Sequence, residues 1–291
     1  MSLTCTSPLI VSLLKYEFRE FTKFPVVVFH ASPEERARFL INKAVYEPAE
    51  LPCGQCKACR LLRSKDWAVR CMHESSLYKR NCFLTLTYDD KHLPVTYNRL
   101  PTLYRYDFTC FMKRLRYYFP DEKIRYFFCG EYGEQTNRPH FHAILFNFDF
   151  FDKQLDSFRS VGRHGDTLYE SETLHRIWKN GHCSIGEVSF ESCSYVARYI
   201  MKKVNGDEAK KHYNGRVPEF IGMSTNPGIG APWFDVNGLS DCILKGCVKY
   251  HTSTGDKLSR IPKYYPKLIK KYYGADVLQA TKIFSRQVSD S

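Results

Sequence analysis

The stretch RPHFHAILF, residues 138–146, is an apolar run that carries histidines at two alternate positions. Its length and its aromatic and aliphatic residues predict a buried β-strand. Because successive side chains of a strand point to opposite faces, His140 and His142 are expected on one face, with Phe141 and Ala143 on the other. Two imidazoles about 7 Å apart along one strand face can converge on a single cation.

The segments around this strand predict an α+β domain. Helix patterns follow Asp107, which can cap a first turn, and recur at residues 174–178 and after Ser194. Strand patterns occur in FLTLTY, IRYFFCGEYG and CSIGEVSF, which are residues 83–88, 124–133 and 183–190. This order, with strands close together in the sequence, predicts a central antiparallel sheet with helices packed on one face.

The texture of the sequence divides the chain into three regions. Residues 1–75 contain short apolar runs and a cysteine cluster, and residues 76–205 contain the α+β pattern. Residues 206–291 are rich in Gly, Pro, Lys and Tyr. We expect this last region to be an irregular basic extension that packs on the central domain, on DNA, or on both.

The composition favours a polyanionic partner. The 291 residues include 43 Lys and Arg against 31 Asp and Glu, a formal net charge of +12, and 15% are aromatic. Single-stranded nucleic acid suits this balance, because bases stack on aromatic faces and phosphates pair with cations. The glycine-rich NPGIGAPW, residues 226–233, lacks the lysine and hydroxyl residue of a P-loop, so no nucleotide cofactor is expected.

The cellular location is constrained by the start of the chain and by its apolar runs. No signal-peptide pattern opens the sequence, and its twelve cysteines are unevenly spaced. Both features favour a reducing cytosol over a secreted disulfide framework. The longest apolar runs, such as residues 24–29, are too short to cross a bilayer, so we expect no membrane contact.

The two histidines have an ordinary interpretation, as structural side chains with satisfied hydrogen bonds, and a functional one, as metal ligands. Glu131 and Glu134 favour the second interpretation, because a hairpin would bring a carboxylate from the preceding strand or turn toward the imidazoles. Two nitrogens and one oxygen leave coordination positions open on a hard divalent ion, which can then hold a phosphate oxygen.

Two tyrosines in the last predicted helix suggest the reaction. Tyr195 and Tyr199 are four residues apart and therefore share a helix face, with Lys202 at the next turn. An amphipathic stripe is the ordinary explanation of such a pair. Arg198 and Lys203 add further cations, and together these residues permit phosphoryl transfer. Attack by either phenol on a DNA phosphodiester would leave a 5′-phosphotyrosyl link and a free 3′-OH.

These motifs resemble those of the HUH endonucleases. RPHFHAILF resembles their His-hydrophobe-His motif, and FLTLTY is similar to the strand motif that precedes it. YVARYIMKK, residues 195–203, is similar to the two-tyrosine motif of rolling-circle initiators from small single-stranded DNA phages. CGEYGE, PCGQCKACR, WAVRCMHE and NPGIG resemble the replication initiator of gokushoviruses, a branch of the microviruses. The resemblance covers most of residues 50–235.

The resemblance implies a fold and a metal site. The catalytic domain, residues 76–205, would be an antiparallel sheet related to RNA-recognition domains, with the histidine strand in its middle. His140 and His142 would bind Mg²⁺ or Mn²⁺. Glu131 is the first choice for the third ligand, and Glu134 is the alternate.

The resemblance also implies a metal-dependent DNA endonuclease and strand transferase that starts rolling-circle replication. Its substrate would be single-stranded origin DNA in the cytoplasm of a bacterial host, and a host helicase and polymerase would assist. The nucleophiles would be Tyr195 and Tyr199, and the scissile phosphate would contact Lys202 and Lys203. Further DNA contacts are expected from Arg138 and Arg198.

The cysteine cluster suggests a second metal. Cys53, Cys56 and Cys59 are spaced by two residues, and Cys71 follows. Thiolates at this spacing can share a tetrahedral ion, so a structural zinc held by these four is one interpretation. An iron–sulfur cluster is disfavoured because the last cysteine of ferredoxin motifs, followed by proline, is absent. A set of free thiols is the third alternative. Bound zinc would present two nearby cations toward DNA, Lys57 and Arg60.

Two other functions are compatible with these motifs. One is a transposase or relaxase-type strand transferase, which would use the same histidines on a different DNA substrate. The other is a non-catalytic, zinc-dependent DNA-binding protein in which the histidines are structural. Metal-dependent cleavage distinguishes either enzyme from the binding protein.

Overall fold

The computed structural model describes residues 5–6, 8–14, 27–29, 46–133, 135–156, 167–198, 204 and 208–290. The chain forms two compact units, residues 1–63 and residues 64–291. Each unit contains an antiparallel sheet of its own. The three regions expected from the sequence texture stay a prediction.

The first unit is built on a three-stranded sheet. Its strands are β1 (Leu9–Leu14), β2 (Val27–Phe29) and β3 (Tyr46–Leu51), in the order β2-β1-β3. β1 and β3 pair along their whole length, with Leu9 opposite Leu51 and Leu14 opposite Tyr46. The chain that enters β1 and the chain that leaves β3 therefore lie at the same end of the sheet. Helix α2 (Lys57–Ser75) begins shortly after β3.

The second unit is built on a seven-stranded antiparallel sheet, which confirms the α+β class. Its order is β10-β5-β6-β4-β9-β8-β7, so the histidine strand β6 lies inside the sheet between β5 and β4. The strands are β4 (Asn81–Thr87), β5 (Arg125–Tyr132), β6 (Pro139–Phe146), β7 (Gln154–Leu155), β8 (Tyr169–Glu170), β9 (Cys183–Gly186) and β10 (Phe220–Met223).

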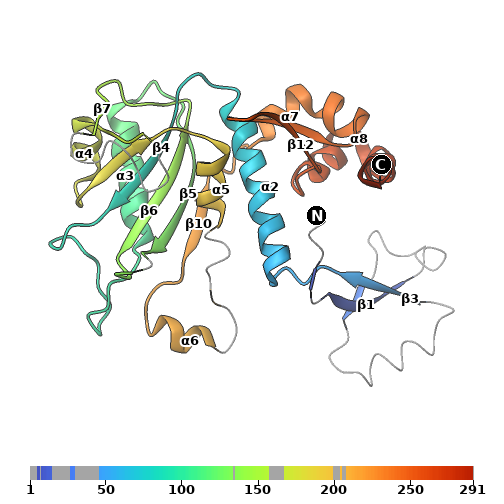
Figure 1. Cartoon of the computed structure of the whole chain (residues 1–291), viewed down its shortest axis with the longest axis horizontal. Helices are drawn as coiled ribbons and strands as arrows, with labels where there is room; N and C mark the ends of the chain where they lie inside the picture. Colours follow the sequence, from blue (N-terminus) through green and yellow to red (C-terminus); the bar gives the residue numbers. More distant parts are fainter. Residues whose placement is uncertain are drawn as a thin grey trace. The chain divides into compact units, whose positions relative to one another are not determined.

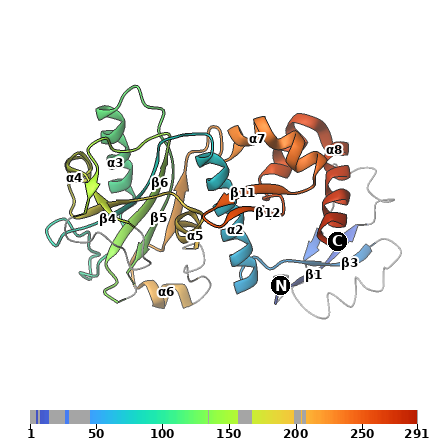
Figure 2. The ribbon, with the colours of Figure 1, turned by 45° about the horizontal axis from the view of Figure 1, so that its top comes forward.

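Helices cover both faces of this sheet, whereas the sequence analysis expected them on one. α3 (Arg105–Tyr118) and α4 (Glu172–Trp178) pack on the face that buries Leu84 and Phe141. α5 (Phe190–Arg198) and the second half of α2 pack on the opposite face, where Phe127 and Ile144 are buried (Figures 1 and 2). The reason is that β5 and β6 carry apolar side chains on both of their faces, and both faces must be shielded from water.

The C-terminal segment is regular, although the sequence analysis expected it to be irregular. It contains α6 (Glu208–Tyr213), β10, α7 (Ala231–Gly238), a π-helix η2 (Leu239–Leu244), the hairpin β11 (Val248–Thr252) and β12 (Gly255–Ser259), and α8 (Tyr265–Asp290). Apolar residues of α7, β11 and α8 form a separate core with Val69 of α2. Helix α2 thus supports two cores with different faces. Among the described residues, no helix has the length and apolar composition needed to span a membrane.

The edge strand β10 belongs to the sheet through its pairing with β5, which places Gly222 opposite Phe128. A Cβ atom on Gly222 would lie 2.2 Å from Cε1 of Phe128, so a side chain there would force the ring or the strand to move. Glycine at this position allows the close approach. The four residues of β10 are too few to show alternation in the sequence.

The motifs WAVRCMHE and NPGIG, which are far apart in the sequence, meet in a buried polar network. Arg70 donates from Nε to the carbonyl of Ile229 at 3.0 Å. Glu74 accepts from the backbone amide of Gly230 at 2.7 Å and from Nε of Arg125 on β5. The glycine-rich loop is thereby tied to α2 and to the sheet. These side chains stabilise the fold, and none of them reaches the histidines.

His73 in the same motif is held as a neutral imidazole. Its Nε2 lies 3.0 Å from the carbonyl of Lys249, which can only accept, so Nε2 donates and Nδ1 accepts from the hydroxyl of Tyr265 at 2.7 Å. Its ring stacks on Trp233 at 3.6 Å. Burial lowers the pKa of His73 to about 4, despite the opposing effect of the Lys249 carbonyl.

This depressed pKa predicts a loss of stability in mild acid. Below pH about 6.5 the unfolded chain binds a proton at His73 that the folded chain refuses until pH about 4, so stability falls as the pH falls through this window. Between pH 7.5 and pH 5 the loss should be about 2 kcal/mol. Urea unfolding of the wild type and of His73→Gln, whose amide stays neutral, would measure it. Equal pH dependence in the two proteins would contradict the prediction.

Candidate functional site

The pairing of β5 with β6 brings one carboxylate beside both histidines. The register places Glu131 opposite His140 and Cys129 opposite His142. Glu131, His140 and His142 therefore lie on one face of the sheet, the face covered by α5. The choice between Glu131 and Glu134 depended on this register, and Glu134 lies outside the described residues.

Both imidazoles converge on one carboxylate oxygen. Nε2 of His140 lies 2.7 Å from Oε1 of Glu131, and Nε2 of His142 lies 2.9 Å from the same atom. The two rings are perpendicular, with their centroids 4.9 Å apart. Glu131 and His142 are buried and His140 is partly exposed, so the group can be approached from the side of His140.

Neighbouring groups hold the two rings in orientation. Nδ1 of His140 lies 3.1 Å from the carbonyl of Arg138, and Nδ1 of His142 lies 3.1 Å from the hydroxyl of Thr85 on β4. The ring of His142 also stacks on Phe83, with the centroids 5.6 Å apart. The sequence analysis did not single out Phe83 or Thr85. Their alternate positions in FLTLTY put them on one face, but only the β4–β6 register brings Thr85 opposite His142.

The chemistry of these donors fits a divalent cation. Because the Arg138 carbonyl only accepts, Nδ1 of His140 donates, and the neutral ring directs the Nε2 lone pair at the carboxylate. A lone pair facing a carboxylate oxygen at 2.7 Å requires a proton or a cation to relieve the repulsion. The ligand atoms of all three residues lie within 4.8 Å of one another. Two imidazoles and a carboxylate are a mixed nitrogen and oxygen set of the kind that divalent ions use.

The carboxylate is kept ionised. Burial raises the pKa of Glu131, but the hydrogen bonds from His140 and His142 outweigh burial and hold the pKa at about 2. Glu131 is therefore negatively charged throughout the physiological pH range. A buried anion flanked by two imidazoles is an electrostatic well for a cation.

Helix α5 brings a phenol to the same group. The hydroxyl of Tyr195 lies 3.5 Å from Oε1 of Glu131, and its ring lies edge-on to His142 with the centroids 4.9 Å apart. The helix begins at Phe190, one turn earlier than expected. Ser189 and Ser192 exchange hydrogen bonds there, each side chain accepting from the backbone amide of the other. This reciprocal cap fixes the start of α5.

The remaining nuclease residues expected from the sequence are placed only in part. Arg198 is the last described residue of α5 and is exposed. Arg138 donates to the carbonyl of Tyr88 at 2.9 Å and to Asp90 at 2.8 Å. Tyr199, Lys202 and Lys203 lie outside the described residues.

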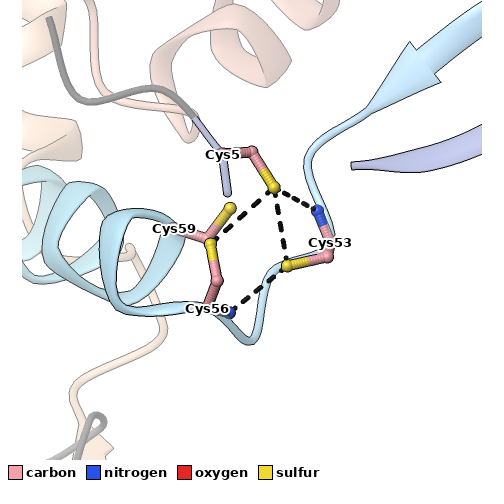
Figure 3. Close-up of side chains that lie close together, drawn as sticks. All are labelled: Cys5, Cys53, Cys56 and Cys59. Carbon is pink, nitrogen blue, oxygen red and sulfur yellow. Dashed lines mark hydrogen bonds between the residues drawn. The ribbon is translucent and has the colours of Figure 1, made fainter. Parts of the chain in front are cut away.

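A second cluster lies in the first unit, and its membership differs from the expected one. Cys53, Cys56 and Cys59 are joined by Cys5, and Cys71 is not part of the group (Figure 3). Cys71 is fully buried in the sheet core of the second unit, where it packs as a small apolar side chain. Among the expected DNA contacts of this segment, Lys57 is exposed, and Arg60 donates to Gln55 at 3.4 Å.

Comparisons with known proteins agree with the nuclease motifs. The family model of the replication-associated protein ORF2 matches residues 81–204, which contain the Glu131, His140 and His142 group. The chain is 36% identical over 251 residues to replication-associated protein ORF2 of Spiroplasma virus 4, covering 83% of this chain and 74% of that protein. It is 33% identical over 242 residues to replication-associated protein VP4 of Bdellovibrio phage phiMH2K, covering 76% and 67%. No solved structure matches.

Proposed function

Because this chain belongs to the family of microvirus replication-associated proteins, we propose that it nicks the single-stranded origin DNA of its phage by tyrosine attack and later rejoins the strand. The observation that carries the proposal is the convergence of Tyr195, His140 and His142 on one oxygen of Glu131. A nucleophile and a set of metal ligands within one small space are the parts that phosphoryl transfer needs.

The nicking step exchanges one phosphate ester for another. The phenolic oxygen of Tyr195 attacks the phosphorus, a Tyr–O–P bond forms, and the P–O3′ bond breaks. The phenol loses its proton, and the departing 3′ oxygen gains one. The product is a 5′-phosphotyrosyl link and a free 3′-OH, and the link conserves the ester for later rejoining.

Glu131, His140 and His142 would hold a divalent cation, and we propose Mg²⁺ or Mn²⁺. When bound, the cation supplies positive charge that offsets the charge of the attacked phosphate. The protein residues keep this site rigid, since Thr85 and the Arg138 carbonyl orient the two rings. A phenol with an ordinary pKa near 10 is a poor nucleophile unless it is positioned beside such a charge.

Rejoining reverses the chemistry with a second tyrosine. We assign this role to Tyr199, four residues after Tyr195 in the sequence, and contacts with the scissile phosphate to Lys202 and Lys203. The free 3′-OH attacks the phosphotyrosyl phosphorus, the Tyr–O–P bond breaks, and the tyrosine regains its proton. Exposed Arg198 would bind the DNA backbone nearby.

The setting follows from the substrate. We propose that a host helicase unwinds the duplex and a host polymerase extends the free 3′-OH, in the cytoplasm of the bacterial host. The chain's net charge of +12 supports binding to DNA, and that binding should weaken steeply with salt.

The test is the covalent intermediate itself. The full chain is incubated with Mn²⁺ and labelled oligonucleotides that tile the plus strand of the phage genome encoding it. We expect one oligonucleotide to give a protein–DNA band that resists denaturant and is abolished by EDTA. Glu131→Gln, which removes the charge and keeps the shape, should reduce the band about 10²- to 10³-fold.

The matched control is Glu122→Gln, because Glu122 makes only a surface ion pair with Arg80. This variant should form the band at the wild-type rate. A band that forms equally well in EDTA, or in Glu131→Gln, would refute the metal site. DNA binding without any band would support the non-catalytic DNA-binding protein instead.

A further inference from the structure

Four cysteine sulfurs from separate parts of the first unit point toward one another. Sγ of Cys5 lies 3.6 Å from Sγ of Cys53 and 3.7 Å from Sγ of Cys56. With Cys59, all four sulfurs lie within 4.8 Å of one another (Figure 3). All four are free thiols. The replication chemistry proposed above makes no use of them.

These separations fit a single tetrahedral ion. A zinc–thiolate bond of about 2.3 Å in a tetrahedron gives sulfur–sulfur edges of about 3.8 Å. A disulfide would need about 2.0 Å between its sulfurs. An iron–sulfur cluster spreads its thiolates over several iron atoms and needs wider separations. The observed 3.6 and 3.7 Å match one ion bound by four sulfurs.

Backbone amides also point at the sulfurs. The amide of Cys56 donates to Sγ of Cys53 at 3.3 Å, and the amide of Cys53 donates to Sγ of Cys5 at 3.4 Å. A further amide, from Gln55, lies 3.4 Å from Sγ of Cys53. Such donors stabilise thiolates, the form in which cysteine binds metal.

The small sheet explains how Cys5 reaches the other three. Because Leu9 of β1 pairs with Leu51 of β3, the segment before β1 and the segment after β3 meet at one end of the sheet. Cys5 lies on the first segment and Cys53 on the second, while Cys56 and Cys59 follow at the start of α2. A three-stranded sheet of this size has little core, and units of this kind commonly depend on a metal or a disulfide.

We propose that Cys5, Cys53, Cys56 and Cys59 bind a structural zinc ion that joins the end of the β1–β3 pair to the start of α2. On binding, the coordinated thiols release their protons to solvent. Cys71, expected from the sequence spacing, has no part in the site. The zinc stabilises the first unit and is separate from the Glu131, His140 and His142 group.

X-ray absorption at the zinc edge tests the ligand set without altering a cysteine. The full chain carrying His140→Ala and His142→Ala is used, so that the other candidate metal site cannot contribute. We expect one zinc per chain after gel filtration, surrounded by four sulfurs at about 2.3 Å. Absence of retained metal, iron in place of zinc, or a shell containing nitrogen or oxygen would overturn the proposal.

A pair of cysteine variants tests which fourth sulfur is used. In the same background, Cys5→Ser should lower zinc affinity by about 10²-fold or more, measured by competition with a chromophoric chelator. Cys71→Ala is the matched control and should leave the affinity within about threefold of its parent. The reverse pattern, with Cys71→Ala losing zinc and Cys5→Ser retaining it, would overturn the assigned ligands.

Discussion

Replacing both tyrosines, Tyr195→Phe with Tyr199→Phe, should reduce formation of the covalent DNA adduct by at least about 10³-fold. The substitutions remove the attacking oxygens and leave nothing to form the phosphate ester. Binding of the same oligonucleotide should persist, because the cations that contact the backbone are unchanged. Adduct yield on a denaturing gel and affinity by fluorescence anisotropy separate the two effects.

The fold should survive this change at Tyr195. A phenylalanine there keeps the ring contacts with His142 and with Phe83, whose centroid lies 6.4 Å away, and loses only the hydroxyl near Glu131. Tyr117→Phe is the matched control, since Tyr117 is 83% exposed. It should form the adduct at the wild-type rate. An adduct that persists in the doubly substituted chain would show that another residue is the nucleophile.

The second large effect is on stability, where Glu74→Ala should lower the free energy of unfolding by about 3–5 kcal/mol. Glu74 is completely buried, and it pairs with Arg125 and with the backbone amide of Gly230. Removing the carboxylate leaves a largely buried guanidinium and a buried amide without their acceptor. Urea unfolding followed by circular dichroism measures the loss.

Glu172→Ala is the control for this prediction. Glu172 pairs with Arg176 one helical turn away, and its side chain is 85% exposed, so the substitution should cost less than about 1 kcal/mol. Similar losses for the two variants would show that the buried network contributes no more than a surface pair. WAVRCMHE would then need another explanation.

Much of the central domain could be predicted from local patterns. The expected strands at residues 83–88, 124–133 and 183–190 all appear with shifted ends, as does the helix that follows residue 104. β10 could not be predicted, because four residues with a central glycine carry no periodicity and the strand is defined by its partner β5. The helices on the second face were missed for a related reason, since strand composition does not tell which helix covers which face.

The candidate site shows the same division. The alternation in β6 was enough to place His140 and His142 on one face, because that alternation is a property of adjacent residues in any strand. The pairing register was needed to bring Glu131 opposite His140, and the packing of α5 was needed to bring Tyr195 beside them.

Local order along the chain therefore determines the strand and helix types, the shared face of the histidines and the basic character of the protein. The folded chain decides the partners. Cys5 meets Cys53 across 48 residues, while Cys71, closer in sequence, is buried in a different core. Periodicity is set by a few neighbouring dihedral angles, but proximity between distant residues depends on strand register and on burial of apolar surface, which no short segment encodes.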